Sequence, residues 1–262
     1  MNADKKKLAL ITGAAGGLGY AIADYLGEQG YRIALLDVDE QGVVDAARRL
    51  GDVRGYGCDI TDAAQVDQTL ARIEKDFGTN PYALINNAGI VRFGELLEHS
   101  VEDFRKVVDV NLVGTFIMCR AAGRLMAQRG SGAIVNVTSL NAFAPSPDAG
   151  AYPATKAAVA KLTEQLALTL GPRGVRVNAV APGFIDAGMS SPIYQDLETR
   201  ALRAASVPAG RLGKAEDIAG TVAFLISEQA DYIHGQHILV DGGVASSLKK
   251  HLPRKAPTDS EK

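Results

Sequence analysis

A tyrosine and a lysine four residues apart are the pair in this sequence best suited to proton transfer. Tyr152 and Lys156 lie in the alanine-rich stretch AYPATKAAVAKL, which is typical of a helix. Residues i and i+4 of a helix share one face, so the ammonium would stand near the phenol. A free tyrosine has a pKa of about 10, and a nearby positive charge favours the phenolate. The pair could take a proton from an alcohol while a hydride leaves for NAD. Alone, the spacing also arises by chance, with the tyrosine packed and the lysine in water.

A glycine-rich turn near the N-terminus predicts a dinucleotide site. The apolar run that ends at Thr12 leads into GAAGGLG, and a helical pattern follows. Glycines let the backbone approach a pyrophosphate, and the helix N-terminus offers free N–H groups. Asp37 ends the next apolar run, where a carboxylate accepts hydrogen bonds from both ribose hydroxyls of NAD and repels the 2′-phosphate of NADP. We therefore expect NAD to be preferred over NADP. The alternative is that the turn and Asp37 are purely structural.

The elements that must position these residues alternate along the 262-residue chain. We expect strands at 8–12, 32–37, 53–59, 83–88, 133–139, 175–182 and 237–241, and helices at 17–29, 40–50, 62–77, 101–128, 151–171 and 215–227. Nearly continuous apolar strands between helices indicate βαβ units and a buried parallel sheet. The expected fold is an α/β, Rossmann-type doubly wound sheet of about seven strands with helices on both faces. Residues 1–248 would form one domain, with 183–213 as a substrate lid and 249–262 as a flexible tail.

Composition excludes several classes of partner. A net charge of −2 argues against nucleic-acid and membrane partners. The apolar run Leu8–Ile11 is too short for a signal peptide, and no stretch approaches the ~20 apolar residues of a membrane span. Cys58 and Cys119 stand in unrelated contexts, and with four histidines they show no metal-ligand spacing. We expect a cytoplasmic protein without a metal site.

Two further residues turn these patterns into a family resemblance. Ser139 ends a predicted strand thirteen residues before Tyr152, and Asn111 lies within the predicted helix 101–128. Together with the glycine turn, the set resembles the short-chain dehydrogenase/reductase family. The resemblance runs from about Leu8 to Val244. Its motifs occur in family order: TGAAGGLG, LLD, CDI, NNAG, VNLVGT, NVTS, YPATK, VNAVAPG, GRLGKAEDIA and VDGG.

The resemblance implies a role for each matched residue. Tyr152 would be the general acid/base, and Lys156 would lower its pKa and hold the nicotinamide ribose. Ser139 would orient the substrate oxygen. The Asn111 side chain would hold a water where its helix is locally irregular. The implied cofactor site comprises Gly13, Gly17, Leu18, Gly19, Asp37, Asp59, Ile60, Asn87, Ala88, Gly89, Tyr152, Lys156, Pro182, Gly183 and Ile185.

The substrate is less well defined by the sequence. The candidate pocket residues are Ser139, Asn141, Ala149, Tyr152 and Phe184, a mixed and partly apolar set. We expect a secondary alcohol of polyol, sugar-like or cyclic type and its ketone. The alternative is 3-oxoacyl-[acyl-carrier-protein] reduction, although Asp37 argues mildly against the NADPH that such reductases usually use. A non-catalytic NAD-binding protein is a third possibility, but it would be expected to lack the tyrosine or the lysine.

Two further expectations come from the resemblance. The family often has threonine where this chain has Ala187, so a contact to the cofactor would be lost or supplied by Ser190 or Ser191. The family also implies a homotetramer, with the long helices 101–128 and 151–171 at one interface. Small residues on those helices would permit close packing between subunits.

Overall fold

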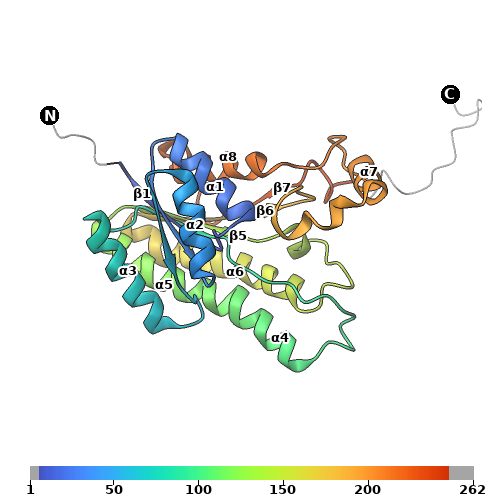
Figure 1. Ribbon diagram of the computed structural model, residues 1–262, viewed down its shortest axis with the longest axis horizontal. Helices are drawn as coiled ribbons and strands as arrows, with labels where there is room; N and C mark the ends of the chain where they lie inside the picture. The colour runs from blue at the N-terminus through green and yellow to red at the C-terminus, as the bar shows by residue number, and fades with distance from the viewer. Residues whose placement is uncertain (1–5, 248–262) are drawn as a thin grey trace, which may run out of the picture.

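One parallel sheet of seven strands forms the centre of the molecule (Figure 1). The computed structural model describes residues 6–247, so the predicted tail 249–262 lies outside the described residues. The strand order is β3-β2-β1-β4-β5-β6-β7, which confirms the doubly wound arrangement. The strands are β1 (Leu8–Thr12), β2 (Arg32–Asp37), β3 (Val53–Gly57), β4 (Ala83–Asn86), β5 (Gly132–Val137), β6 (Val175–Pro182) and β7 (His237–Val240).

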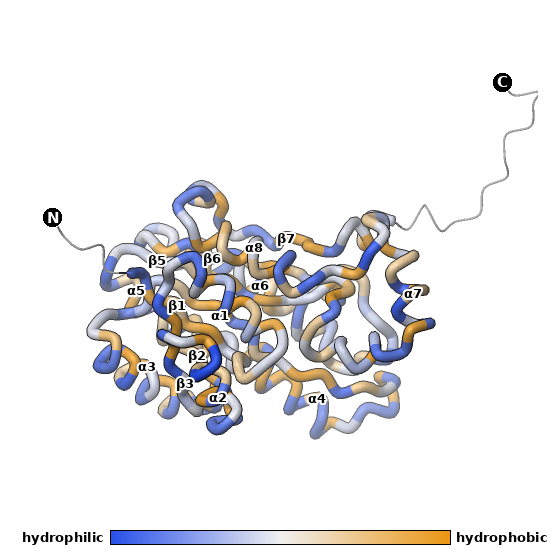
Figure 2. Tube along the Cα trace, turned by 45° about the horizontal axis from the view of Figure 1, so that its top comes forward, coloured by the Kyte–Doolittle hydropathy of each residue, from blue (hydrophilic) through white to orange (hydrophobic). Residues whose placement is uncertain are grey.

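Two layers of helices cover the sheet, as predicted. One face is covered by α1 (Gly17–Glu28), α2 (Glu40–Leu50) and α8 (Ala215–Ile226), and the other by α3 (Ala63–Phe77), α5 (Thr115–Arg129) and α6 (Tyr152–Leu170). Strand residues alternate between these two cores: Ile11 belongs to the first and Leu10 to the second. In Figure 2 the tube of α3 changes between blue and orange, as expected of a helix with one buried face. No helix within residues 6–247 is long and apolar enough to cross a membrane.

Three predicted strands extend too far at their carboxyl ends. β3 ends at Gly57, β4 at Asn86 and β5 at Val137, two residues before the predicted limits in each case. After β3 the chain is turned by Asp59, whose Oδ1 accepts hydrogen bonds from the Thr61 N–H (2.9 Å) and hydroxyl (2.7 Å). Side-chain bonds of this kind replace ladder pairing with a turn. The polar residues at these three ends therefore belong to loops at one edge of the sheet.

The predicted helix 101–128 is interrupted. The structure has α4 (Val101–Val108), a π-helical segment Asp109–Gly114, and then α5. The Thr115 hydroxyl donates to the carbonyl of Asn111 at 2.8 Å within this widened turn. π-helical turns occur mostly as single insertions in α-helices, often at functional sites. The irregularity expected at Asn111 is thus confirmed, and it leaves that side chain fully buried.

The predicted lid is an excursion that returns to its starting point. Its base is closed by a bridge in which Gly213 N donates to Phe184 O and Asp186 N donates to Gly213 O, both at 2.9 Å. It contains a helix that the sequence analysis missed, α7 (Leu197–Ser206), which lies apart from both helical layers in Figure 1. No residue of α7 is buried, and its leucines, Leu197 and Leu202, are exposed. The overlooked signal was Asp196, whose carboxylate caps the helix.

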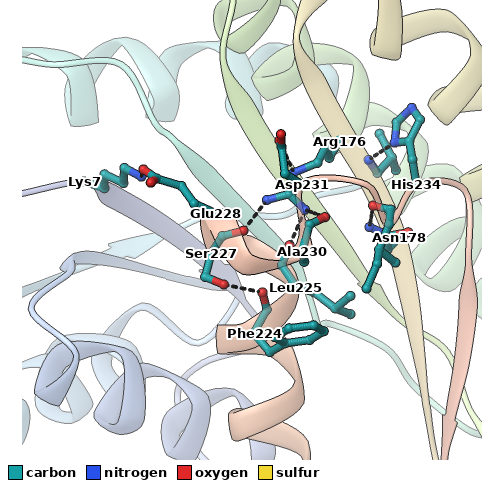
Figure 3. A network of polar contacts seen from close by, with 12 residues as sticks. Lys7, Arg176, Asn178, Phe224, Leu225, Ser227, Glu228, Ala230, Asp231 and His234 are labelled. Carbon is teal, nitrogen blue, oxygen red and sulfur yellow. Dashed lines mark hydrogen bonds and ion pairs between the residues drawn. The ribbon is translucent and has the colours of Figure 1, made fainter.

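An arginine on β6 closes the end of α8 (Figure 3). The Arg176 guanidinium donates to the carbonyls of Leu225 (2.6 Å), Ser227 (2.8 Å) and Ala230 (3.1 Å). Carbonyls at a helix C-terminus lack partners within the helix, so these bonds satisfy groups that would otherwise be orphaned. Nearby, His234 accepts from the main chain of β6 through Nδ1 (3.0 Å) and contacts the main chain of α6 through Nε2 (2.8 Å). β6 is thereby tied to helices on both faces.

Replacing this arginine is expected to destabilise the protein. In Arg176→Met three carbonyl groups lose a charged donor, and we expect the free energy of unfolding to fall by about 2–4 kcal/mol. The matched control is Arg48→Met, which removes an exposed ion pair with Asp45 (2.8 Å) and should cost less than about 0.5 kcal/mol. Urea denaturation measures both values. Equal effects of the two substitutions would show that the Arg176 bonds do not stabilise the α8 terminus.

Candidate active site

The predicted serine, tyrosine and lysine converge at the carboxyl end of β5. Ser139 follows this strand, Tyr152 is the first residue of α6, and Lys156 lies one turn further along. Lys156 is 3% exposed, its Nζ donates to the Val137 carbonyl at 2.9 Å, and it lies 5.4 Å from the centroid of the Tyr152 ring. The Ser139 hydroxyl is close enough to the phenol to act on its pKa by hydrogen bonding. Three side chains that can donate or accept a proton therefore lie together in one site.

Burial shifts both titrating groups toward their uncharged forms. It lowers the pKa of Lys156 from 10.5 to about 8. It also raises the pKa of Tyr152, while the hydrogen bond with Ser139 acts in the opposite direction. The sequence analysis expected Lys156 to lower the pKa of Tyr152. Removal of the phenolate from water is the largest effect on this pKa in the protein alone, and the effect expected of Lys156 stays a prediction.

The Asn111 carboxamide is engaged mainly by protein groups. Its Oδ1 accepts from Ile90 N (2.8 Å), and its Nδ2 donates to Ile90 O (2.9 Å) and Thr155 Oγ1 (3.2 Å). These bonds join the segment after β4 to α6, and they leave only a lone pair of Oδ1 to receive a water. A Cβ at Gly89 would stand 3.3 Å from both this Oδ1 and Lys156 Nζ. The absence of a side chain at Gly89 therefore leaves space between Asn111 Oδ1 and Lys156 Nζ.

The glycine turn is shaped by close backbone contacts. Gly13 has φ +64°, and a Cβ there would stand 2.7 Å from Ala88 Cα. At Gly19 a Cβ would stand 2.7 Å from Asn87 Nδ2. The Thr12 hydroxyl accepts from the N–H groups of Asn87 (3.1 Å) and Ala88 (3.0 Å), so the NNAG segment braces the turn. Thr12 is a supporting residue that the sequence analysis did not assign, and its place directly before the first glycine was the available signal.

The N-terminus of α1 is free to bind an anion. Side chains of Asp39, Asp62 and Ser100 cap α2, α3 and α4, but no side chain caps α1 at Gly16. The first N–H groups of a helix have no partner within it, so those of the first turn of α1, which includes Leu18, remain available. No atom lies within 4 Å of the position that a Gly16 Cβ would occupy. An uncapped helix end beside open space fits the pyrophosphate of a dinucleotide.

The two acidic residues expected in the cofactor site, Asp37 and Asp59, are both held by hydrogen bonds. The Asp37 carboxylate accepts from Ala15 N (3.0 Å) and Asp39 N (3.1 Å), which fixes it against the glycine turn where an adenosine ribose was expected. Asp59 already binds Thr61, and these hydrogen bonds lower its pKa. The neighbouring Ile60 is 7% exposed, so its side chain belongs to the core and only its main chain can contact a ligand.

The start of the lid meets the glycine turn. Pro182 ends β6 beside Val240, and a Cβ at Gly183 would stand 2.6 Å from Asp241 Cα. Ile185 is buried at the bridge that closes the lid. Further along, Gly188 lies so close to Gly17, which has φ +56°, that a Cβ on the latter would stand 2.8 Å from Gly188 Cα. The predicted lid is therefore in direct contact with the glycine turn.

Two predicted substrate residues, Ala149 and Asn141, are engaged in contacts within the protein. Ala149 is 3% exposed, so its side chain is buried, and its backbone joins the loop before α6 to Gly94. Asn141 Oδ1 accepts from Ser146 N at 2.7 Å and organises its own loop. Phe184, in contrast, lies at the base of the lid. In the part of the chain that the structure describes, no three His, Cys, Asp or Glu side chains lie close enough to hold a metal ion.

Alanine substitutions at Gly13 and Gly16 should distinguish a glycine required by its backbone conformation and close contacts from one with open space beside it. Gly13→Ala places a side chain at positive φ against Ala88, so we expect a loss of stability of about 1–3 kcal/mol and loss of cofactor binding. Gly16→Ala meets no protein atom and should keep wild-type stability within about 0.5 kcal/mol. Thermal unfolding and dinucleotide titration measure the two effects. A stable Gly13→Ala variant that binds cofactor would contradict the assigned close approach.

Removing the buried ammonium should stabilise the protein in a pH-dependent way. The unfolded lysine loses its proton near pH 10.5, whereas Lys156 in the folded protein loses it near pH 8. Between these values the unfolded state binds more protons, so wild-type stability rises with pH in this window. Lys156→Met should therefore be about 1–3 kcal/mol more stable than wild type at pH 7, with a smaller advantage at pH 10. Denaturant titrations at both pH values test this, with exposed Lys161→Met as the control. A pH-independent difference would contradict it.

The site's geometry agrees with comparisons to known proteins. A family model described as enoyl-(acyl carrier protein) reductase matches residues 13–245. D-threitol dehydrogenase of Mycolicibacterium smegmatis is 36% identical, over 90% of this chain and 92% of its own. A 3-oxoacyl-[acyl-carrier-protein] reductase of Staphylococcus aureus is 37% identical, over 91% and 98%.

Solved structures give the same result. A putative gluconate dehydrogenase from Agrobacterium tumefaciens superimposes with a TM-score of 0.87 at 33% identity, covering 92% of this chain and 97% of its own. An NAD⁺-bound xylitol dehydrogenase gives 0.85 at 33% identity, over 90% and 98%. Family match, relatives and fold agree with the Ser139, Tyr152 and Lys156 geometry. The chain therefore belongs to the short-chain dehydrogenase/reductase family and is an NAD(P)-dependent oxidoreductase acting on CH–OH groups.

Proposed function

We propose that the protein interconverts a secondary alcohol of polyol, sugar-like or cyclic type and its ketone, with NAD as the preferred cofactor. The observation that carries the proposal is the convergence of Ser139, Tyr152 and Lys156 at the sheet edge beside the glycine turn. Relatives named for D-threitol and xylitol support a polyol-like substrate. The Asp37 carboxylate held against the turn supports NAD.

In this proposal each residue has one task. Gly13, Gly17 and Gly19 let the backbone and the α1 N-terminus hold the pyrophosphate, and Asp37 binds the adenosine ribose. The bound dinucleotide supplies a hydride acceptor. Tyr152 takes the hydroxyl proton of the alcohol, with its phenolate favoured by the Lys156 charge.

The other polar groups position the substrate and the tyrosine. The Ser139 hydroxyl holds the substrate oxygen beside the phenol. Lys156 has donors beyond the one used by Val137, and these can bind ribose hydroxyls. Proton transfer of this kind contributes roughly 10²–10⁴-fold, and the alignment of the reacting carbon contributes further. In the reductive direction Tyr152 donates the proton.

Removal of the phenol should abolish chemistry without abolishing binding. In Tyr152→Phe we expect turnover to fall by at least about 10³-fold, since no other described group replaces the hydroxyl, while the cofactor dissociation constant changes little. Tyr232→Phe is the matched control, because that side chain is fully exposed. Steady-state kinetics and fluorescence titration give both quantities. Substantial turnover by Tyr152→Phe would exclude it as the general acid/base.

A second candidate function is 3-oxoacyl-[acyl-carrier-protein] reduction, an activity for which several relatives are named. For this candidate NADPH would be the expected cofactor. The two candidates differ in cofactor and substrate. We would supply NAD or NADP with secondary alcohols, polyols and 3-hydroxyacyl thioesters and follow absorbance of the reduced nicotinamide. Turnover with NAD on one alcohol class is expected. Turnover confined to NADP and thioesters would support the second candidate instead.

The cofactor assignment can be tested at one side chain. Asp37→Ser removes the carboxylate that would repel a 2′-phosphate, so we expect the NAD-over-NADP preference in kcat/KM to fall by about 10- to 100-fold. Asp24→Ser in the same region is exposed and should leave the preference unchanged. An Asp37→Ser enzyme with the wild-type preference would show that discrimination lies elsewhere.

A homotetramer remains part of the proposal. Exposed apolar side chains gather on the π-helical segment and the helices expected at an interface. They are Val101, Phe104, Val113, Phe116 and Leu168. Exposed apolar surface of this kind is typical of subunit contacts.

A further inference from the structure

One cation of the lid has no acidic partner. Arg200 pairs with Asp186 at 2.6 Å, and Arg211 binds both oxygens of Asp217 at 2.7 and 2.9 Å. Arg203 lies one turn beyond Arg200 in α7, and no carboxylate within residues 6–247 approaches it to 4.0 Å. It is partly buried rather than fully solvated. Its guanidinium is therefore available to an anion from outside the described chain.

Two aromatic rings fix the position of this guanidinium. Arg203 Cζ lies 5.3 Å from the ring centroid of Phe184 and 5.7 Å from that of Tyr194. Tyr194 is 3% exposed, so this side of the arrangement is firmly packed. The contact from Nη1 to the Tyr194 hydroxyl is long, at 3.5 Å. A guanidinium held by aromatic rings keeps its planar fork of N–H donors for a further partner.

The arginine lies on the side of the sheet where catalysis is expected. Phe184 follows β6 and Ser139 follows β5, and these two strands are paired, with Val137 opposite Val180. Both residues therefore leave the same edge of the sheet, outside the carboxyl ends of neighbouring strands. Ligands of open α/β sheets bind in this region. A group on the substrate that extends from Ser139 toward the lid would approach the Phe184–Arg203 pair.

We propose that Arg203 binds a carboxylate of the substrate. The inference rests on the proposed function and narrows its substrate class to secondary alcohols that carry a carboxylate, such as sugar acids. A carboxylate is charged and accepts two parallel hydrogen bonds from one guanidinium, one on each oxygen, whereas a hydroxyl of a neutral polyol offers a single uncharged oxygen. The other lid arginines are already paired, so one unpaired cation matches a monoanion better than a phosphate dianion.

The kinetic test compares acids with neutral alcohols of the same skeleton. Pairs of an aldonate and its alditol, such as D-gluconate and D-sorbitol, are oxidised with NAD by wild type and Arg203→Met. We expect wild type to prefer the acid, and Arg203→Met to lose about 10- to 100-fold in kcat/KM for the acid but less than about 2-fold for the alditol. Arg203→Lys keeps the charge without the fork and should fall between.

A matched control comes from the same helix. Arg200→Met removes a cation of equal size whose partner is Asp186, so it should change the acid-to-alditol ratio by less than about 2-fold. α7 buries no residue, and a thermal melt establishes that both variants remain folded. An equal loss for acid and alditol in Arg203→Met would overturn the proposal, as would a wild-type preference for the alditol.

A binding measurement separates this proposal from the proposed function. Aldonates are titrated calorimetrically into the enzyme–NADH complex, which requires no turnover. Binding by wild type that weakens at least about 10-fold in Arg203→Met supports the carboxylate site. Absence of aldonate binding by wild type overturns it. A protein that binds aldonates through Arg203 but oxidises neither acids nor alditols would contradict only the proposed function.

Discussion

The burial of Lys156 is the constraint to which the rest of the site conforms. An ammonium that is 3% exposed can be held only where donors find oxygen, and the Val137 carbonyl at the end of β5 provides it. This contact fixes the approach of α6 to the sheet, and with it the position of Tyr152. Gly89 lacks the side chain that would fill the neighbouring space. Asn111 reaches the same space from a helix widened by one π-helical turn. Burial of the Lys156 ammonium lowers the stability of the protein. It also creates a site whose net charge depends on whether one proton is bound.

Much of this arrangement could be predicted because the chemistry follows the sheet. Parallel strands read as apolar runs, and the polar residues after them must meet at one edge, which is why Ser139 and the NNAG segment were assignable. The orientation of side chains within loops was not predictable. Ala149 turned inward because its backbone pairs with Gly94, a contact between segments 55 residues apart. The extent to which burial raises the Tyr152 pKa was not predictable either, since burial depends on packing and not on the spacing of two residues.

The irregular helix at Asn111 was expected from the family resemblance and not from local pattern. The π-helical turn depends on tertiary contacts of Asn111 and Gly114 and has no local sequence signal of comparable strength. α7 was missed because it is short, with ten residues, and lies in a segment whose scattered Ser, Pro and Gly are typical of a loop. The uncapped N-terminus of α1, in contrast, could be predicted from the sequence. The absence of a capping side chain was visible in GAAGGLG, and the structure shows that the space beside it is open.

The bridge between Ile185 and Gly213 has a consequence for how such enzymes diversify. Because the two ends of the lid are fastened together, their positions on the core do not depend on the length of the segment between them. Lengthening a flexible loop between fixed ends costs little, about 0.6 kcal/mol for each doubling. Evolution can therefore replace or extend this segment, including the cation it presents, while the proton-handling residues stay in place. A changed lid can therefore accept a new substrate while the residues at the carboxyl edge of the sheet keep their positions.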